Sequence, residues 1–205
     1  MKYFALTVSL VVLLSPQAFS QSRSEQPAVS PCTLTVTQSP AIRGVKLGMS
    51  AQELFTLFPG SAEHDEIKSA MAKADDYPQF GVVPISFAIS QYANNDRFAG
   101  IDYVQSYLFD GRVARFSVQY SGLPEGPQWM NADDFITKLG ESLKLPAAKD
   151  WAAYQGGKNV KCNGFEMRVT TPNQASLSVM TSELFEKQGQ RRKAYEEKKR
   201  REFKP

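Results

Sequence analysis

The sequence is poor in the residues that build catalytic and metal centres. Its 205 residues include one histidine, His64, and two cysteines, Cys32 and Cys162. A lone histidine without neighbouring cysteines does not form a zinc site. The chain also lacks a Gly-x-Ser-x-Gly elbow, a phosphate-binding loop and a dinucleotide-binding glycine pattern. We therefore expect no catalytic residue, no metal and no cofactor, and we predict that the protein is not an enzyme.

His64 offers the one enzymatic alternative. It lies between Glu63 and Asp65, and a small hydrolase could use it as a general base. Such polar surroundings are more typical of the first turn of a surface helix. The adjacent aspartates elsewhere in the chain do not make an acid pair, because neighbouring residues point apart on a helix.

Long apolar runs are absent except at the N-terminus. Lys2 is followed by an apolar segment over residues 4–14 and by a small-x-small site that ends at Ser20. This pattern predicts a signal peptide over residues 1–20 that is cleaved near Ser20. We expect a periplasmic or secreted protein, with a retained N-terminal anchor as the alternative. Residues 21–31 are rich in Ser, Gln and Pro and are predicted to form a disordered linker.

The two cysteines predict one disulfide bond. In an exported chain an even pair of cysteines is usually oxidised. A bond between Cys32 and Cys162 would close a loop of about 130 residues and tie the start of the mature chain to the far half of the fold. Two unpaired thiols are the alternative.

Composition is that of a globular protein, with 42% apolar residues, 22% charged residues and a net charge of +3. The chain is organised around one short predicted helix. Ser50 and Glu53 have the spacing of a capping box, in which each side chain bonds the other residue's backbone amide. Pro59-Gly60 ends the helix. Its apolar stripe consists of Ala51, Leu54, Leu57 and Phe58.

A similar signal recurs in the second half of the chain. Asn131 and Asp134 repeat the cap position of Ser50 and the third helical position of Glu53 at one constant offset. We predict an α+β fold of two related halves, 32–120 and 121–181, each with helices packed on an antiparallel β-meander. The alternative is that any capped amphipathic helix gives this pattern.

Tight turns at Asp110-Gly111 and Asn163-Gly164 predict two β-hairpins. Across the first turn, the alternation predicts that the tyrosines share one apolar face with Phe116, as in a sheet with one dry and one wet side. The predicted pairs are Phe109 with Arg112, Tyr107 with Ala114, Tyr103 with Val118 and Ile101 with Tyr120, and the polar face holds Asp102, Ser106, Arg115, Ser117 and Gln119.

Three further segments are predicted from local patterns. Residues 33–37 alternate polar and apolar side chains and favour a strand. Residues 61–74 favour a second helix that Ser61 caps. Residues 150–154 favour a last helical turn.

From residue 182 the chain is strongly charged, with Lys and Arg in excess over Glu. Glu196 with Arg200 has the four-residue spacing that stabilises a helix. We predict a charged C-terminal helix or tail over 182–205 that could bind an anionic membrane surface. Its glutamates disfavour nucleic acid, and a solvated helix without a ligand is the alternative. The candidate anion-binding residues are Arg191, Arg192, Lys193, Lys198, Lys199, Arg200 and Arg201.

The run Leu47-Gly48-Met49-Ser50, followed by Glu53-Leu54, resembles the small envelope proteins of the BamE/SmpA type. These proteins share a helix-pair-on-antiparallel-sheet module with the β-lactamase inhibitor protein (BLIP), which carries it twice. The resemblance implies a noncatalytic protein that acts by binding other proteins. The chain lacks the lipid-attachment cysteine of the members that assemble membranes, and no interface motif aligns.

Together, these features predict an exported, noncatalytic protein-binding module of the bacterial cell envelope whose partner is an unknown envelope protein. The alternative is an anion- or membrane-surface-binding protein that acts through its basic C-terminal helix.

Overall fold

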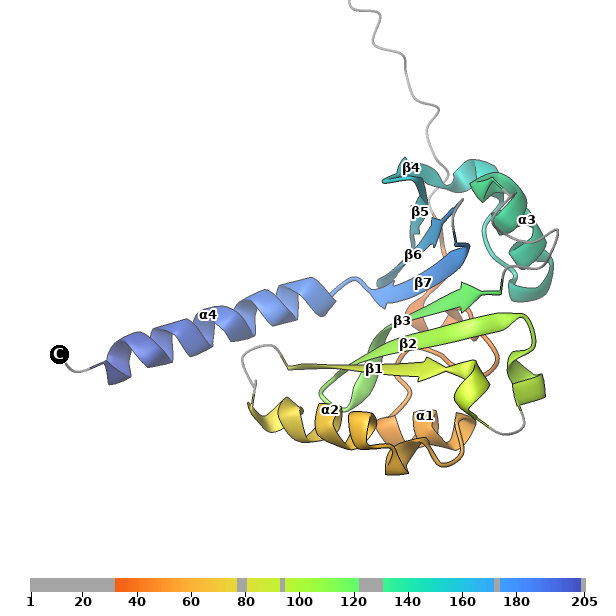
Figure 1. Cartoon of the computed structure of the whole chain (residues 1–205). Coiled ribbons are helices and arrows are strands. Elements are labelled where there is room, and N and C mark those ends of the chain that lie inside the picture. The colour runs from red at the N-terminus through yellow and green to blue at the C-terminus, as the bar shows by residue number, and fades with distance from the viewer. Residues whose placement is uncertain (1–31, 77–80, 93–94, 122–130, 172–173, 204–205) are drawn as a thin grey trace, which may run out of the picture.

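The computed structural model describes residues 32–76, 81–92, 95–121, 131–171 and 174–203. The signal peptide expected at 1–20 and the linker expected at 21–31 lie outside the described residues. The described chain combines four α-helices with one seven-stranded antiparallel sheet (Figure 1). This confirms the prediction of a mixed α+β protein.

The sheet contains two antiparallel meanders, β1–β3 and β4–β7, and each runs from one edge of the sheet to its centre. The strand order is β1-β2-β3-β7-β6-β5-β4, and every neighbouring pair is antiparallel. The last strand of each meander, β3 and β7, therefore meet at the centre. The strands are β1 Val82–Ala88, β2 Ile101–Phe109, β3 Arg112–Tyr120, β4 Ala152–Tyr154, β5 Gly157–Lys161, β6 Phe165–Thr170 and β7 Ser176–Thr181.

Two helices, α1 and α3, begin where the caps predict. Before α1, the Ser50 amide donates to the Glu53 carboxylate at 2.7 Å and the Glu53 amide donates to Ser50 Oγ at 3.2 Å, which confirms the capping box. Before α3, the Asp134 amide donates to Asn131 Oδ1 at 2.9 Å. The α-helices are α1 Ala51–Leu57, α2 Asp65–Asp76, α3 Ala132–Leu143 and α4 Leu184–Glu202, and the 3₁₀ turns are Val36–Gln38, Ser61–Glu63, Ile89–Gln91, Asn95–Phe98 and Ala148–Asp150.

Both meanders contribute to one hydrophobic core. Helices α1 and α2 lie along β1–β3, and α3 lies beside the other part of the sheet, while α4 projects away from the body (Figure 1). An aromatic cluster surrounds Phe58, whose ring stacks on Phe87 with centroids 3.9 Å apart and on Phe98 at 4.7 Å. Other fully buried members are Leu54, Val104, Phe116, Ile136, Phe165, Met167 and Leu177.

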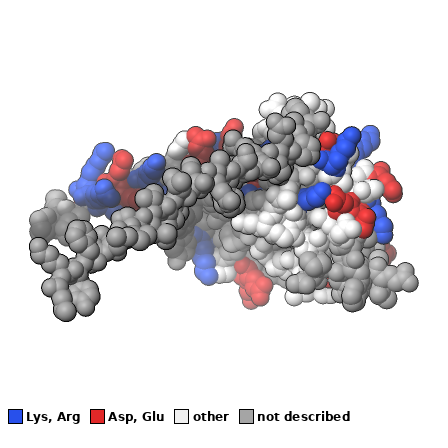
Figure 2. All heavy atoms as spheres, turned by 90° about the horizontal axis from the view of Figure 1, so that it is seen from above, with Lys and Arg blue, Asp and Glu red and all other residues white. Residues whose placement is uncertain are grey.

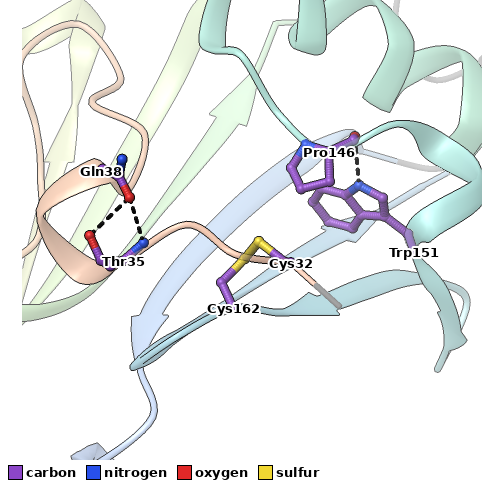
Figure 3. The surroundings of a disulfide bond; sticks show 6 residues. All are labelled: Cys32, Thr35, Gln38, Pro146, Trp151 and Cys162. Carbon is purple, nitrogen blue, oxygen red and sulfur yellow. Dashed lines mark hydrogen bonds between the residues drawn. A yellow bond between two sulfur atoms is a disulfide. The ribbon is translucent and has the colours of Figure 1, made fainter. Parts of the chain in front are cut away.

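A disulfide joins Cys32 to Cys162, as predicted (Figure 3). Next to it, the Asn163 amide donates to the carbonyl of Leu34 at 2.9 Å. Near the disulfide, the Trp151 indole donates a hydrogen bond to the Pro146 carbonyl at 3.1 Å. The first described segment is thereby fixed to the turn between β5 and β6.

Three local predictions are wrong. Residues 33–37 make only an isolated bridge between Thr35 and Asn163, because the Thr35 amide donates to the Gln38 side chain and starts a 3₁₀ turn instead. Ser61 does not cap a helix: it is fully buried, follows Gly60 in a left-handed conformation and begins a 3₁₀ turn before α2. Residues 150–154 end a 3₁₀ turn and then form β4.

The predicted register of the β2–β3 hairpin is correct at its ends and wrong in its middle. Phe109 pairs with Arg112, but Tyr107 pairs with Arg115 and Tyr103 with Gln119. The register shifts at two irregularities, and a shift of one residue turns a side chain to the other face. Tyr103 and Tyr107 consequently lie on the face opposite Phe116, while Ser106 is buried among apolar side chains.

Within the described segments, no helix combines the length and the apolar character needed to cross a bilayer.

Candidate functional site

One face of the sheet is turned away from α1, α2 and α3, and we call it the open face. Its side chains alternate along each strand with those that enter the core, and most are half-buried. It is a broad surface made by all the long strands, and not a cleft between elements. Its members are Ser86, Tyr103, Gln105, Tyr107, Phe109, Arg115, Ser117, Gln119, Asn159, Glu166, Arg168, Thr170, Ser176, Ser178 and Met180.

Small polar side chains occupy the centre of the open face. Ser178 Oγ donates to Ser117 Oγ at 2.9 Å across the junction of β7 and β3. The register extends this pair into a row that contains Gln105 on one side and Arg168 and Asn159 on the other. At a strand spacing of about 4.8 Å, the row from β2 to β5 is about 19 Å long. Ser117 and Ser178 have the smallest side chains of the row, so the backbone is most accessible to a partner at this pair.

Aromatic and cationic side chains rise on the β2–β3 side of this row. The Tyr107 hydroxyl donates to Gln105 Oε1 at 3.0 Å. The guanidinium of Arg115 lies over the Tyr107 ring, with its Cζ 4.9 Å from the ring centroid. This cation–π contact holds both side chains in defined positions.

A second stacked arginine lies on the β4–β6 side. The Cζ of Arg168 is 4.6 Å from the centroid of the Tyr154 ring. Glu166 forms an ion pair with Arg168, and both side chains are largely shielded from solvent. The positive charge of Arg168 is thus balanced within the protein.

Helix α4 bounds one end of the open face. Leu184 is buried against Ala114 and Met180. About two helical turns later, Arg191 lies over the Phe109 ring at 4.6 Å and forms an ion pair with Asp110. These contacts anchor the first part of α4 and leave the remainder to project.

The seven predicted anion-binding residues all lie on α4, but they do not form one positive surface. Figure 2 shows Lys and Arg on the projecting part of the molecule interspersed with acidic side chains. Three of them form ion pairs within the helix: Arg192 with Glu196 at 2.9 Å, Lys198 with Glu202 at 3.7 Å and Arg201 with Glu197 at 4.0 Å. Lys199 lies over the Tyr195 ring, and Arg191 pairs with Asp110. Lys193 and Arg200 make no ion pair with a described residue.

His64 is exposed and stacks on Tyr92, with ring centroids 5.4 Å apart. Burial raises the pKa of Tyr92, and the nearby Glu66 carboxylate adds to this effect. Among the residues that the structure describes, no three His, Cys, Asp or Glu side chains are placed together as metal ligands.

The other pKa shifts arise from hydrogen bonds and burial within the fold. The Ser50 amide, which donates a hydrogen bond to the Glu53 carboxylate, lowers the pKa of Glu53. A hydrogen bond to Glu183 raises the pKa of Lys187 at the start of α4. Burial raises the pKa of Tyr120, which packs edge-on against Phe135, to about 12.

Sequence reasoning placed Arg115, Ser117 and Gln119 on the polar face, and they do lie on the open face, but it missed the two tyrosines. It assigned Tyr103 and Tyr107 to the core, because aromatic side chains at alternating positions usually mark the buried face of a strand. The signal that could have corrected it is the second alternating set of β2, Val104 and Leu108, which is fully buried.

Comparison of the chain with models of protein families, with curated proteins and with solved structures finds no match. The function must therefore be argued from the geometry and the sequence.

Proposed function

We propose that this protein is an exported, noncatalytic module of the bacterial cell envelope that binds a protein partner on the open face of its sheet. The observation that carries this proposal is the open face itself. Tyr103, Tyr107 and Arg115 stand beside a row of polar residues on a surface that α1, α2 and α3 leave uncovered. Tyrosine and arginine are the residues that contribute most to protein interfaces, because they combine apolar contact area with hydrogen bonding.

The cysteine pair supports the proposed location. A disulfide between Cys32 and Cys162 is the state expected in an oxidising compartment such as the periplasm or the outside of the cell. Cleavage of a signal peptide near Ser20 would leave a linker of about eleven residues before Cys32.

The proposed internal repeat is supported by topology and by caps. Both meanders run from an edge strand to the centre, where Ser117 pairs with Ser178. In both halves, a polar side chain caps the helix that precedes the meander, Ser50 in one and Asn131 in the other. This arrangement agrees with the resemblance to BamE/SmpA-type proteins and to BLIP.

The proposal is tested by comparing two double variants. Tyr103→Ser with Tyr107→Ser removes aromatic surface from the open face, whereas Lys68→Ser with Lys138→Ser alters exposed positions on α2 and α3. Each tagged protein is incubated with the native envelope fraction, and bound proteins are quantified by mass spectrometry. We expect the helix variant to retain the partners of the native protein and the open-face variant to lose them. Equal retention by both variants would contradict the proposal.

A second candidate function is binding to an anionic membrane surface through α4. It is favoured by Lys193 and Arg200, which no described carboxylate neutralises. Polybasic segments bind anionic lipids with about 1 kcal/mol per cation near the surface. Replacing both residues with Gln should then weaken binding to vesicles that contain anionic lipid, measured by co-sedimentation, and leave neutral vesicles unaffected. Unchanged sedimentation would remove this candidate.

A further inference from the structure

Three arginines on the open-face side of the protein share one arrangement. In each, the guanidinium lies over an aromatic ring at between 4.6 and 4.9 Å: Arg115 over Tyr107, Arg168 over Tyr154 and Arg191 over Phe109. The ring holds one side of the guanidinium plane, which leaves the nitrogen edge free to form hydrogen bonds.

Two of the three arginines meet a carboxylate. Arg168 pairs with Glu166, and Arg191 pairs with Asp110. These two groups are complete, because a ring covers the plane and a carboxylate neutralises the charge.

The Arg115 guanidinium lies over the Tyr107 ring but forms no ion pair with a carboxylate of the described chain. Its neighbours across the sheet are Tyr107 on β2 and Met180 on β7, and neither carries a negative charge. The nearest acidic residue along that row, Glu166, lies one strand beyond Met180 and already pairs with Arg168.

The Arg115 guanidinium therefore carries a charge that no described carboxylate neutralises. Its Nε is buried without a hydrogen-bond partner among the described residues, as is Arg168 Nε, so the missing carboxylate is what distinguishes Arg115. Arginine stays ionised at all physiological pH values. A carboxylate that accepted hydrogen bonds from the terminal nitrogens would neutralise this charge and use the fork geometry of arginine.

We propose that Arg115 is the anchor for an aspartate or glutamate side chain that the partner protein presents to the open face. The inference rests on the proposed function and adds the chemistry of the partner. The incoming carboxylate completes at Arg115 the arrangement that Glu166 completes at Arg168. The Tyr107 ring provides an apolar wall on one side of the contact, whereas Met180 on the other side is buried against Leu184.

The test selects random peptides displayed on phage against the folded protein with its disulfide intact. Binders are kept only if Tyr107→Ser weakens them, so that they report on the open face. We expect these peptides to be enriched in Asp or Glu and to bind Arg115→Met about thirtyfold more weakly, as for a charge pair shielded from solvent. Substitution of their acidic residue by Asn or Gln should cause a similar loss.

Lys138→Met is the matched control, because it also removes one positive charge but from α3. It should leave the affinity unchanged, and thermal unfolding of both variants checks that each is folded. Peptides that bind the open face without acidic enrichment, or that bind Arg115→Met as tightly as the native protein, would overturn the inference and leave the proposed function standing. If no selected peptide responds to Tyr107→Ser, both proposals fail.

Discussion

The two parts of the sheet, β1–β3 and β5–β7, match on one side and differ on the other. On the side that faces the helices, Phe116 and Val118 of β3 lie opposite Val179 and Leu177 of β7, and all four are fully buried. On the open face, β2 presents two tyrosines and a glutamine, whereas the equivalent strand β6 presents a glutamate, an arginine and a threonine.

The difference shows which residues folding requires. Positions in the core must be apolar and well packed, because burial of apolar surface is the main stabilising contribution. Folding does not require apolar residues on the open face, so the residue types there can reflect what the protein binds. The aromatic β2–β3 side and the charged β6 side are therefore the part of the molecule where function is to be sought.

The largest effect is expected from the disulfide, which belongs to the β5–β6 side. Replacing Cys32 and Cys162 with Ala should lower the free energy of unfolding by up to about 5 kcal/mol, because the bond closes a long loop in the unfolded chain. Chemical denaturation of the variant and of the reduced native protein should give the same lowered midpoint. Equal midpoints for oxidised and reduced protein would contradict this expectation.

The next effect compares the aromatic packing of the two parts. Phe58→Ala should destabilise the protein by about 3–5 kcal/mol, because its ring stacks on both Phe87 and Phe98. Among the described residues, Phe135 contacts one aromatic ring, that of Tyr120, so Phe135→Ala should cost less. Urea unfolding of the two variants measures this, and a larger loss for Phe135→Ala would reverse the comparison.

A smaller effect depends on pH and arises where β3 meets α3. The pKa of Tyr120 is raised to about 12, above the ordinary value of 10.0. The contribution of neutral Tyr120 to the free energy of unfolding is fully present below pH 10. It is lost as the pH rises towards 12, because in that window Tyr120 ionises in the unfolded chain but not in the folded protein. The native protein should lose on the order of 2 kcal/mol there, and Tyr120→Phe should not. Identical alkaline unfolding curves would refute this cause.

The smallest effect concerns the two helix caps. Ser50→Ala and Asn131→Ala each remove a side chain that accepts from a first-turn amide, and each should cost about 1 kcal/mol. Thermal unfolding should show nearly additive losses in the double variant, because the caps belong to different helices. A loss at only one cap would mean that the two helix starts are not equivalent.

Local chemistry explains what could be predicted from the sequence. The Ser50–Glu53 capping box and the tight turns at Asp110 and Asn163 depend on residues close together in the chain, and the structure has all of them. The disulfide followed from an even cysteine count in a chain with an export signal.

The rest depends on contacts that a sequence pattern does not contain. An extra residue in β3, Ala114, places Phe116 opposite Ser106 and so on the face opposite Tyr107, and no residue near Ala114 announces this bulge. Residues 33–37 have a strand pattern but pair at only one position, Thr35, because a side chain captures the backbone amide. The candidate site could be predicted only in part for the same reason. Arg115, Ser117 and Gln119 were expected on the polar face and lie there, whereas Tyr103 and Tyr107 were assigned to the core.

The most direct test of the account is site-specific photo-crosslinking in the native envelope. A benzophenone amino acid is placed at Tyr107 on the open face and, in a second protein, at Lys138 on α3. The account predicts a discrete protein adduct from position 107 that is absent from position 138. Adducts from Lys138 alone, or the same adducts from both positions, would contradict the claim that the partner binds the open face.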